Sequence, residues 1–174
     1  MGTTVVVGVW LMFAQAAAGA RTSNACALLS AGDVQKIVGA AIVESRPSAA
    51  ESRGLLLDQC YLSTGSPRSI SIAVAAPVAK RGGSISPRQF WRDRFHARSA
   101  GEGETAESGE TGARPVRGVG DEAFWSGTPV AGALYVLRGD TFVRVSVGGI
   151  ADERQRIERS REVAAAILPR LPKR

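Results

Sequence analysis

The chain has 174 residues and a net charge of +6, with 44% apolar and 22% charged residues. This balance is that of an ordinary globular protein, and it excludes a disordered chain and, beyond the N-terminus, a membrane-spanning one. The basic excess favours acidic partners, such as an acidic polymer or an anionic lipid surface.

The first twenty residues have the layout of a secretory signal peptide. Residues 2–20 carry no charge, and an apolar run over residues 5–13 is followed by small residues that end in Ala18-Gly19-Ala20. This order predicts cleavage before Arg21 and a protein that is secreted or held in the cell envelope, outside the cytoplasm. Residues 21–174 then form a single exported domain of common size, with no transmembrane span after cleavage.

The leader departs from the usual pattern at its start, because its first basic residue, Arg21, follows the apolar run instead of preceding it. Either the true start lies upstream or Met1 is misassigned. An uncleaved anchor and a buried N-terminal helix are the alternatives to a cleaved signal. The strongly apolar part is short beside the ~20 residues that a bilayer span needs.

The two cysteines, Cys26 and Cys60, both lie in the exported part. An even count in an exported chain predicts a disulfide, which the chain-entropy model expects to stabilise the fold by about 3.8 kcal/mol. A lipid-modified Cys26 and two free thiols are the alternatives. Lipoprotein signals place leucine three residues before the modified cysteine, and here that residue is Ser23.

The exported domain begins with a helix. Ser30 and Asp33 have the spacing of a capping box, which predicts a helix start, and Gly39 predicts its end. Residues 45–54 are small and polar and contain proline and glycine, so we expect a loop there. A weak strand is expected near residues 41–44.

A hairpin and a second helix follow. Apolar residues alternate with polar ones over residues 69–74, which is the pattern of a strand. Residues 58–63 form a second expected strand, and a turn lies between the two. This arrangement predicts an antiparallel pair. Ser86-Pro87 predicts the start of a helix, with serine as the cap and proline at the first position. In that helix, Trp91 and Phe95 share a face one turn apart.

The last third contains a loop, strands and a helix. Residues 99–113 hold four glycines and four glutamates and no aliphatic residue larger than alanine, so we expect a mobile loop. Strands are expected over residues 115–118, 122–126, 134–138 and 141–147. The last two are joined by Gly139-Asp140, a two-residue turn typical of a tight hairpin. A final helix begins near Ala151.

The expected order is therefore helix, three strands, helix, three or four strands, helix. Because hairpins dominate, the sequence predicts an α+β domain with an antiparallel sheet and the helices packed on one face.

Several segments together carry a resemblance. They are Cys26-Ala27-Leu28-Leu29 before the first helix, Cys60-Tyr61, and Gly118-Val119-Gly120-Asp121-Glu122-Ala123-Phe124-Trp125 before the late hairpin. In these the chain looks like the small exported domains of unknown function, often lipoproteins, that are common in high-GC bacteria, especially actinobacteria. The resemblance implies a bacterial protein in which Cys26 and Cys60 are bridged, and it carries over no activity.

Motifs for catalysis or cofactor binding are weak. The glycines of residues 118–121 lack the Lys-Ser/Thr of a phosphate loop, so we interpret them as a turn. Arg138-Gly139-Asp140 spells an adhesion tripeptide, but a hairpin needs the same Gly-Asp for its backbone. His96 is the sole histidine, which provides no metal site by itself, and we interpret it as a surface residue. We assign no catalytic, cofactor or metal residue.

Two kinds of side chain remain as candidates. The first is a set of carboxylates that a fold might bring together, namely Asp58, Asp121, Glu122 and Asp140. The second is a set of aromatic residues that suit a binding surface or a core, namely Trp91, Phe124 and Trp125.

We therefore expect an exported non-catalytic domain that binds an envelope protein, an acidic polymer or an anionic lipid surface. Export argues against nucleic acid as a partner. The alternative is a small envelope hydrolase that uses carboxylates from separate loops. Two carboxylates about 5–9.5 Å apart in one deep cleft favour the hydrolase, whereas a shallow aromatic or basic surface favours the binding domain.

The leader generates the first testable prediction. Expressed in a suitable bacterium with its own N-terminus, the protein should appear outside the cytoplasm and begin at Arg21 or within a few residues of it. Fractionation and N-terminal sequencing check this. Recovery of the chain from the cytoplasm with Met1 intact would contradict it.

Overall fold

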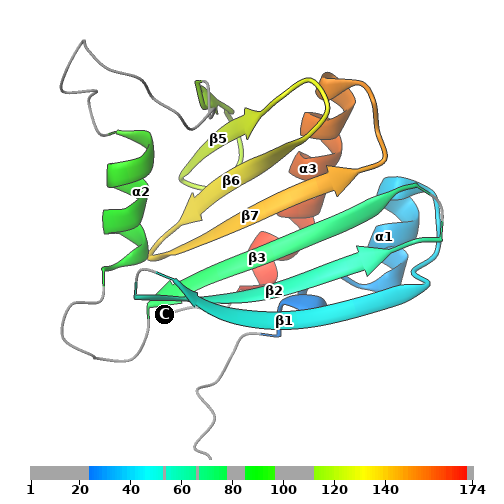
Figure 1. Ribbon diagram of the computed structural model, residues 1–174, viewed down its shortest axis with the longest axis horizontal. Coiled ribbons are helices and arrows are strands. Elements are labelled where there is room, and N and C mark those ends of the chain that lie inside the picture. Colours follow the sequence, from blue (N-terminus) through cyan, green and yellow to red (C-terminus); the bar gives the residue numbers. More distant parts are fainter. Residues whose placement is uncertain (1–23, 53, 66, 78–84, 97–111, 172–174) are drawn as a thin grey trace, which may run out of the picture.

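The structure is a computed structural model that describes residues 24–52, 54–65, 67–77, 85–96 and 112–171. Within these ranges the chain forms a seven-stranded antiparallel sheet in the order β1-β2-β3-β7-β6-β5-β4, with three α-helices (Figure 1). The α+β class and the order of elements are those expected. The expected signal peptide, and all but the last two residues of the expected 99–113 loop, lie outside the described residues.

The strands are β1 (Glu44–Ser52), β2 (Leu55–Ser63), β3 (Ser69–Pro77), β4 (Arg114–Pro115), β5 (Glu122–Gly127), β6 (Gly132–Arg138) and β7 (Thr141–Gly148). The helices are α1 (Ala31–Val38), α2 (Pro87–Phe95) and α3 (Glu153–Ile167), with 3-10 helices η1 (Ala25–Leu28) and η2 (Leu168–Arg170).

The expected helix and hairpin signals are confirmed. The Ser30 side chain accepts a hydrogen bond from the backbone of Asp33, whose carboxylate accepts one from the Ser30 backbone. Gly39 ends α1 with φ +74°, a left-handed conformation that glycine adopts without a steric penalty. The pairing of β6 with β7 closes at Arg138 and Thr141, on either side of the two-residue turn.

β1 corrects the expectation of a loop over residues 45–54. It pairs along its whole length with β2, from Glu44 opposite Ser63 to Ser52 opposite Leu55. All nine residues of β1 are exposed, so the strand has no apolar alternation that a sequence pattern can detect. Its backbone pairing holds it, and Pro47 is tolerated because β1 is an edge strand. The expected strand at 115–118 is likewise shorter, since β4 spans only Arg114–Pro115.

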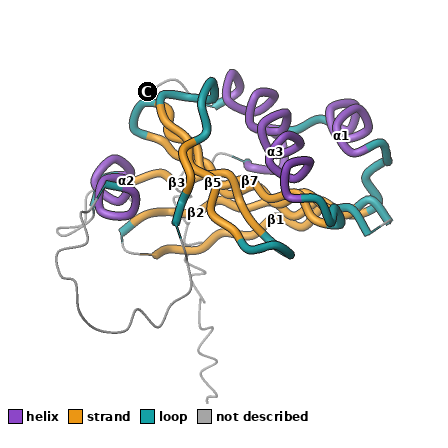
Figure 2. The backbone as a smooth tube through the Cα atoms, turned by 90° about the horizontal axis from the view of Figure 1, so that it is seen from above, coloured by secondary structure: helices purple, strands orange, loops and turns teal. Residues whose placement is uncertain are grey.

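The sheet buries side chains on both faces, which corrects the expectation that the helices share one face. η1, α1 and α3 cover the first face, which we call the α1/α3 face, and its buried side chains include Ile72, Val136 and Val143. α2 covers part of the opposite face, the α2 face, where Phe142 is buried beside Trp91. Phe142 and Val143 are adjacent in β7, and side chains alternate between faces along a strand. Figure 2 shows α1 and α3 together and α2 apart from them.

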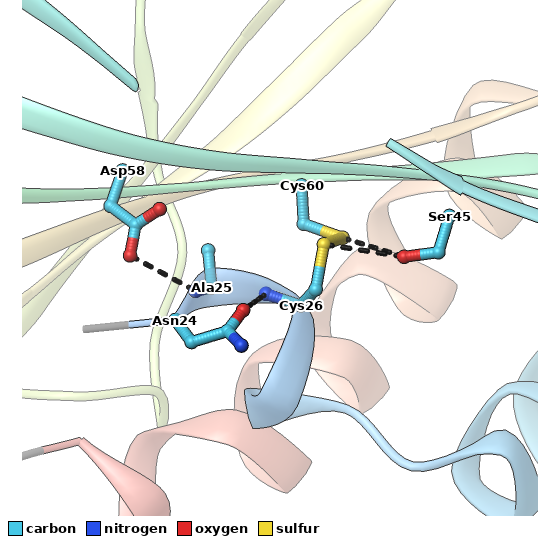
Figure 3. The surroundings of a disulfide bond; sticks show 6 residues. All are labelled: Asn24, Ala25, Cys26, Ser45, Asp58 and Cys60. Carbon is cyan, nitrogen blue, oxygen red and sulfur yellow. Dashed lines mark hydrogen bonds between the residues drawn. A yellow bond between two sulfur atoms is a disulfide. The ribbon is translucent and has the colours of Figure 1, made fainter. Parts of the chain in front are cut away.

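The predicted disulfide joins η1 to β2. Cys26 and Cys60 are bonded, with their Cα atoms 5.0 Å apart, and Cys60 lies on the α1/α3 face. Two hydrogen bonds support this junction (Figure 3): the backbone N–H of Ala25 donates to the buried Asp58 carboxylate at 3.0 Å, and the Ser45 hydroxyl donates to the Cys26 sulfur at 3.3 Å. The bond uses the sulfur atom that a lipid anchor on Cys26 would need.

A buried arginine ties α3 to two loops. Arg156 is 2% exposed, and its guanidinium donates hydrogen bonds to the carbonyls of Ile150 and Ala151 before α3 and of Thr128 and Pro129 after β5. A buried cation is tolerated only when such acceptors replace its water. Arg156 therefore fixes the turn between β5 and β6 against the start of α3.

The disulfide generates the second prediction. Replacing Cys26 or Cys60 with serine should lower the free energy of unfolding by about 2–4 kcal/mol, because the unfolded chain loses a covalent constraint. The double variant should cost little more than either single one, since one bond is lost in each case. Denaturant titration measures this, and mass spectrometry should show a two-dalton rise on reduction. Equal stability of all variants would contradict the account.

Candidate functional site

α2 is attached to the sheet by aromatic contacts. Phe90 stacks on Phe142 with ring centroids 5.2 Å apart, and Phe95 stacks on Phe124 at 4.7 Å. Trp91, which is 2% exposed, lies among these rings. Aromatic side chains bury much apolar area each, so a helix of nine residues can be held in place by three of them.

A carboxylate on β5 reinforces this attachment. Glu122 accepts hydrogen bonds from the Trp91 indole and from the His96 ring, each at 2.8 Å. These two hydrogen bonds, with that from Trp91 the stronger influence, hold the pKa of Glu122 below its ordinary value. His96, expected as a plain surface residue, is half-exposed and caps the end of α2.

Beside α2 the α2 face carries an open groove of about 370 Å³. Its lining combines aromatic, aliphatic, small polar and basic side chains: Leu57, Gln59, Ser71, Ala73, Phe90, Arg94, Tyr135, Phe142 and Arg144. Strand pairing explains the floor, since Gln59, Ala73, Arg144 and Tyr135 are successive partners across β2, β3, β7 and β6. The volume lies within the range of about 300–1,000 Å³ typical of small-molecule pockets.

Two guanidinium groups border the groove at Tyr135. The Cζ atoms of Arg94 and Arg144 lie over the Tyr135 ring, 5.2 and 5.9 Å from its centroid. Arg144 also donates a hydrogen bond to the Tyr135 hydroxyl at 3.3 Å. None of the described residues that line the groove is a carboxylate, and two of them are arginines beside an apolar wall.

A smaller groove of about 180 Å³ continues from the first, because Tyr135 and Arg144 line both. Its remaining lining comes from the turn between β5 and β6 and the adjoining strand ends, namely Ser126, Gly127, Thr128, Ala131, Gly132 and Ala133. On the α1/α3 face, Gly132 leaves room for the Trp125 indole, because a Cβ atom on residue 132 would lie 2.3 Å from that ring.

Three of the four candidate carboxylates accept hydrogen bonds, each from a different part of the chain, and the fourth, Asp140, lies in the turn between β6 and β7. Asp58 is buried on the α1/α3 face and accepts from Ala25, whereas Glu122 lies on the α2 face. The Asp121 carboxylate accepts a hydrogen bond from the backbone of Gly139 at 2.7 Å. Asp58 and Glu122 therefore do not form the facing pair that the hydrolase needs.

The candidate aromatic residues divide between the two faces. Trp125 is core on the α1/α3 face, where its indole donates to Glu153 at 2.9 Å. Trp91 and Phe124 pack on the α2 face, next to the groove. Among the described residues, no three His, Cys, Asp or Glu side chains are grouped as a metal site needs, and no helix is long and apolar enough to cross a membrane.

Sequence patterns did not indicate the two residues that both grooves share. Arg144 and Tyr135 stand at polar-facing positions of the predicted strands over 134–138 and 141–147, where they resemble ordinary solvent-facing residues. The register of β6 against β7 brings them opposite each other. The detectable signal was the pairing that follows from the Gly139-Asp140 turn, since a two-residue turn fixes the register.

In comparisons with protein-family models, curated proteins and solved structures, none matches the chain.

The Glu122 contacts generate the third prediction. Because the pKa of Glu122 is lowered in the folded state, its contribution to stability is complete above the ordinary value of 4.5 and is lost as the pH falls through the lowered value. Glu122→Gln should therefore flatten the fall in the free energy of unfolding between about pH 5 and pH 3.

The matched control is Glu158→Gln on α3, whose carboxylate is well exposed and 3.8 Å from Arg161. Urea titrations at several pH values, followed by tryptophan fluorescence, measure both variants against the parent. An acid profile of Glu122→Gln identical to that of the parent would contradict the role given to Glu122.

Proposed function

We propose that the protein is an extracytoplasmic, non-catalytic binding domain and that the groove on its α2 face is the binding site for an anionic ligand. The observation that carries this proposal is the lining of the groove, where Arg94 and Arg144 flank Tyr135 beside the apolar wall of Phe90 and Phe142.

The form of the groove supports binding over hydrolysis. Glycoside hydrolysis needs two carboxyl groups facing the same bond, about 5–9.5 Å apart. The described lining offers guanidinium, amide and hydroxyl groups instead. Such groups orient and retain an anion. They do not supply the general acid and general base that hydrolysis needs. A small envelope hydrolase is therefore the weaker candidate.

Two other features support a location outside the cytoplasm. The apolar leader over residues 2–20 precedes the domain, and the Cys26–Cys60 disulfide is of the kind that persists in oxidising compartments. With the resemblance to small exported bacterial domains, they favour a partner at the cell envelope. The net charge of +6 favours an acidic one.

The proposal is tested by filling the groove. Ala73 is half-buried in the floor of the groove, and Ala73→Phe should occupy it, since phenylalanine suits a strand. Isothermal titration of residues 21–174 with polyglutamate, octanoate and vesicles containing anionic phospholipid covers the three expected ligand types.

At least one probe should bind the parent and lose tenfold or more in affinity for Ala73→Phe. The matched control is Ala49→Phe, the same change at an exposed position of β1, which pairs with Asp58 of the α1/α3 face. Absence of binding by all three probes, or equal binding to Ala73→Phe and the parent, would overturn the proposal.

A further inference from the structure

The groove has two chemically different walls. One is apolar, formed by Leu57 and by the stacked rings of Phe90 and Phe142. The other is cationic, formed by Arg94 and Arg144 around Tyr135. Both walls belong to one space of about 370 Å³, so a single bound molecule contacts both.

The two walls discriminate among the three expected ligand types. An acidic polymer carries charge along its length and gains little from Leu57 or Phe90 beside the charges. A folded protein docks through about 800 Å² of surface per partner, which is far more than the lining of this groove exposes. A flexible hydrocarbon chain that ends in an anionic group matches both walls.

We infer that the ligand is a single-chain anionic amphiphile, with a carboxylate or phosphate head at Arg94 and Arg144 and a hydrocarbon chain along Phe90 and Phe142 towards Leu57. This inference rests on the proposed function, because it names the ligand class of the same groove. Guanidinium groups suit carboxylate and phosphate oxygens through charge-assisted hydrogen bonds. The chain gains by leaving water, in proportion to the area that the apolar wall covers.

The smaller groove has a part in this arrangement. It begins at Tyr135 and Arg144, on the side of the cationic wall, and it is lined by Ser126 and Thr128. The position of this groove leaves space for a polar group attached to the head, such as glycerol. The anionic group is thereby held between a chain site and a polar site.

The first experiment is a chain-length series by isothermal titration, with hexanoate, octanoate and decanoate below their critical micelle concentrations. Affinity should rise by up to about fourfold per added methylene, which converts from ~0.8 kcal/mol per buried CH₂. Octanol, which has the chain without the charge, should bind at least tenfold more weakly than octanoate. Comparing the affinity for octyl phosphate with that for octanoate distinguishes a phosphate head from a carboxylate head.

The second experiment uses variants of the two walls. Arg144→Gln should weaken octanoate binding by about tenfold or more and leave octanol binding unchanged, and Phe90→Ala should reduce the gain per methylene. The matched control is Arg154→Gln, an exposed arginine of α3 on the far side of the sheet, which should bind like the parent. Thermal melts verify folding, and Arg94→Gln replaces Arg144→Gln if that variant does not fold.

The outcomes separate this inference from the proposed function. Affinity that is independent of chain length, together with polyglutamate binding that Ala73→Phe abolishes, overturns the amphiphile and keeps the binding groove. Octanol binding as tightly as octanoate overturns the role of the arginines. Failure of every probe to bind in the groove overturns both proposals.

Discussion

A seven-stranded sheet has two faces, and this chain has enough helix in its described part to cover one face and a portion of the other. Nine residues of helix extend about 14 Å at ~1.5 Å per residue, whereas a nine-residue strand extends about 30 Å at ~3.3 Å per residue. α2 therefore covers only part of the α2 face, where Leu55, Ala75 and Phe142 are buried. Next to α2, this face carries the groove. Among the described residues, a short helix on long strands leaves room for it.

The position of α2 also determines the shape of the groove, because Phe90 and Arg94 belong to the helix while the floor belongs to the strands. Contacts that hold α2 on the sheet are thus contacts that hold the walls of the groove together. The hydrogen bond from the Trp91 indole to Glu122 is one of them. The α1/α3 face uses the same device, since the Trp125 indole donates to Glu153 on α3, which also pairs with Arg114. In each case a buried indole satisfies its N–H with a carboxylate from another element.

Sequence patterns predicted those parts of the fold that local chemistry decides. The capped helix that ends at Gly39 and the hairpin of β6 and β7 depend on neighbouring residues, so their signals are visible in the chain. β1 was missed because its nine exposed residues carry no apolar periodicity, and its pairing with the backbone of β2 is not visible in its own sequence. The face that α2 covers was missed for another reason. The spacing of Trp91 and Phe95 indicates that one side of the helix is buried, and it contains no information on which face of the sheet buries it. The groove depends on this placement of α2, because Phe90 and Arg94 of the helix line it together with residues of the strands. The pairing of Arg144 with Tyr135, by contrast, follows from the local hairpin of β6 and β7.

The central claim is that the α2 face, beside its short helix, is where this protein binds its ligand. The most direct measurement is a nuclear magnetic resonance titration of isotope-labelled residues 21–174 with octanoate, with backbone amide shifts mapped onto the structure. The account predicts that the largest shifts cluster at Ser71, Ala73, Tyr135 and Arg144 and along α2, and that α1 and α3 are unaffected. Shifts concentrated in the space between α1 and α3, or scattered over the surface without saturating, would contradict it.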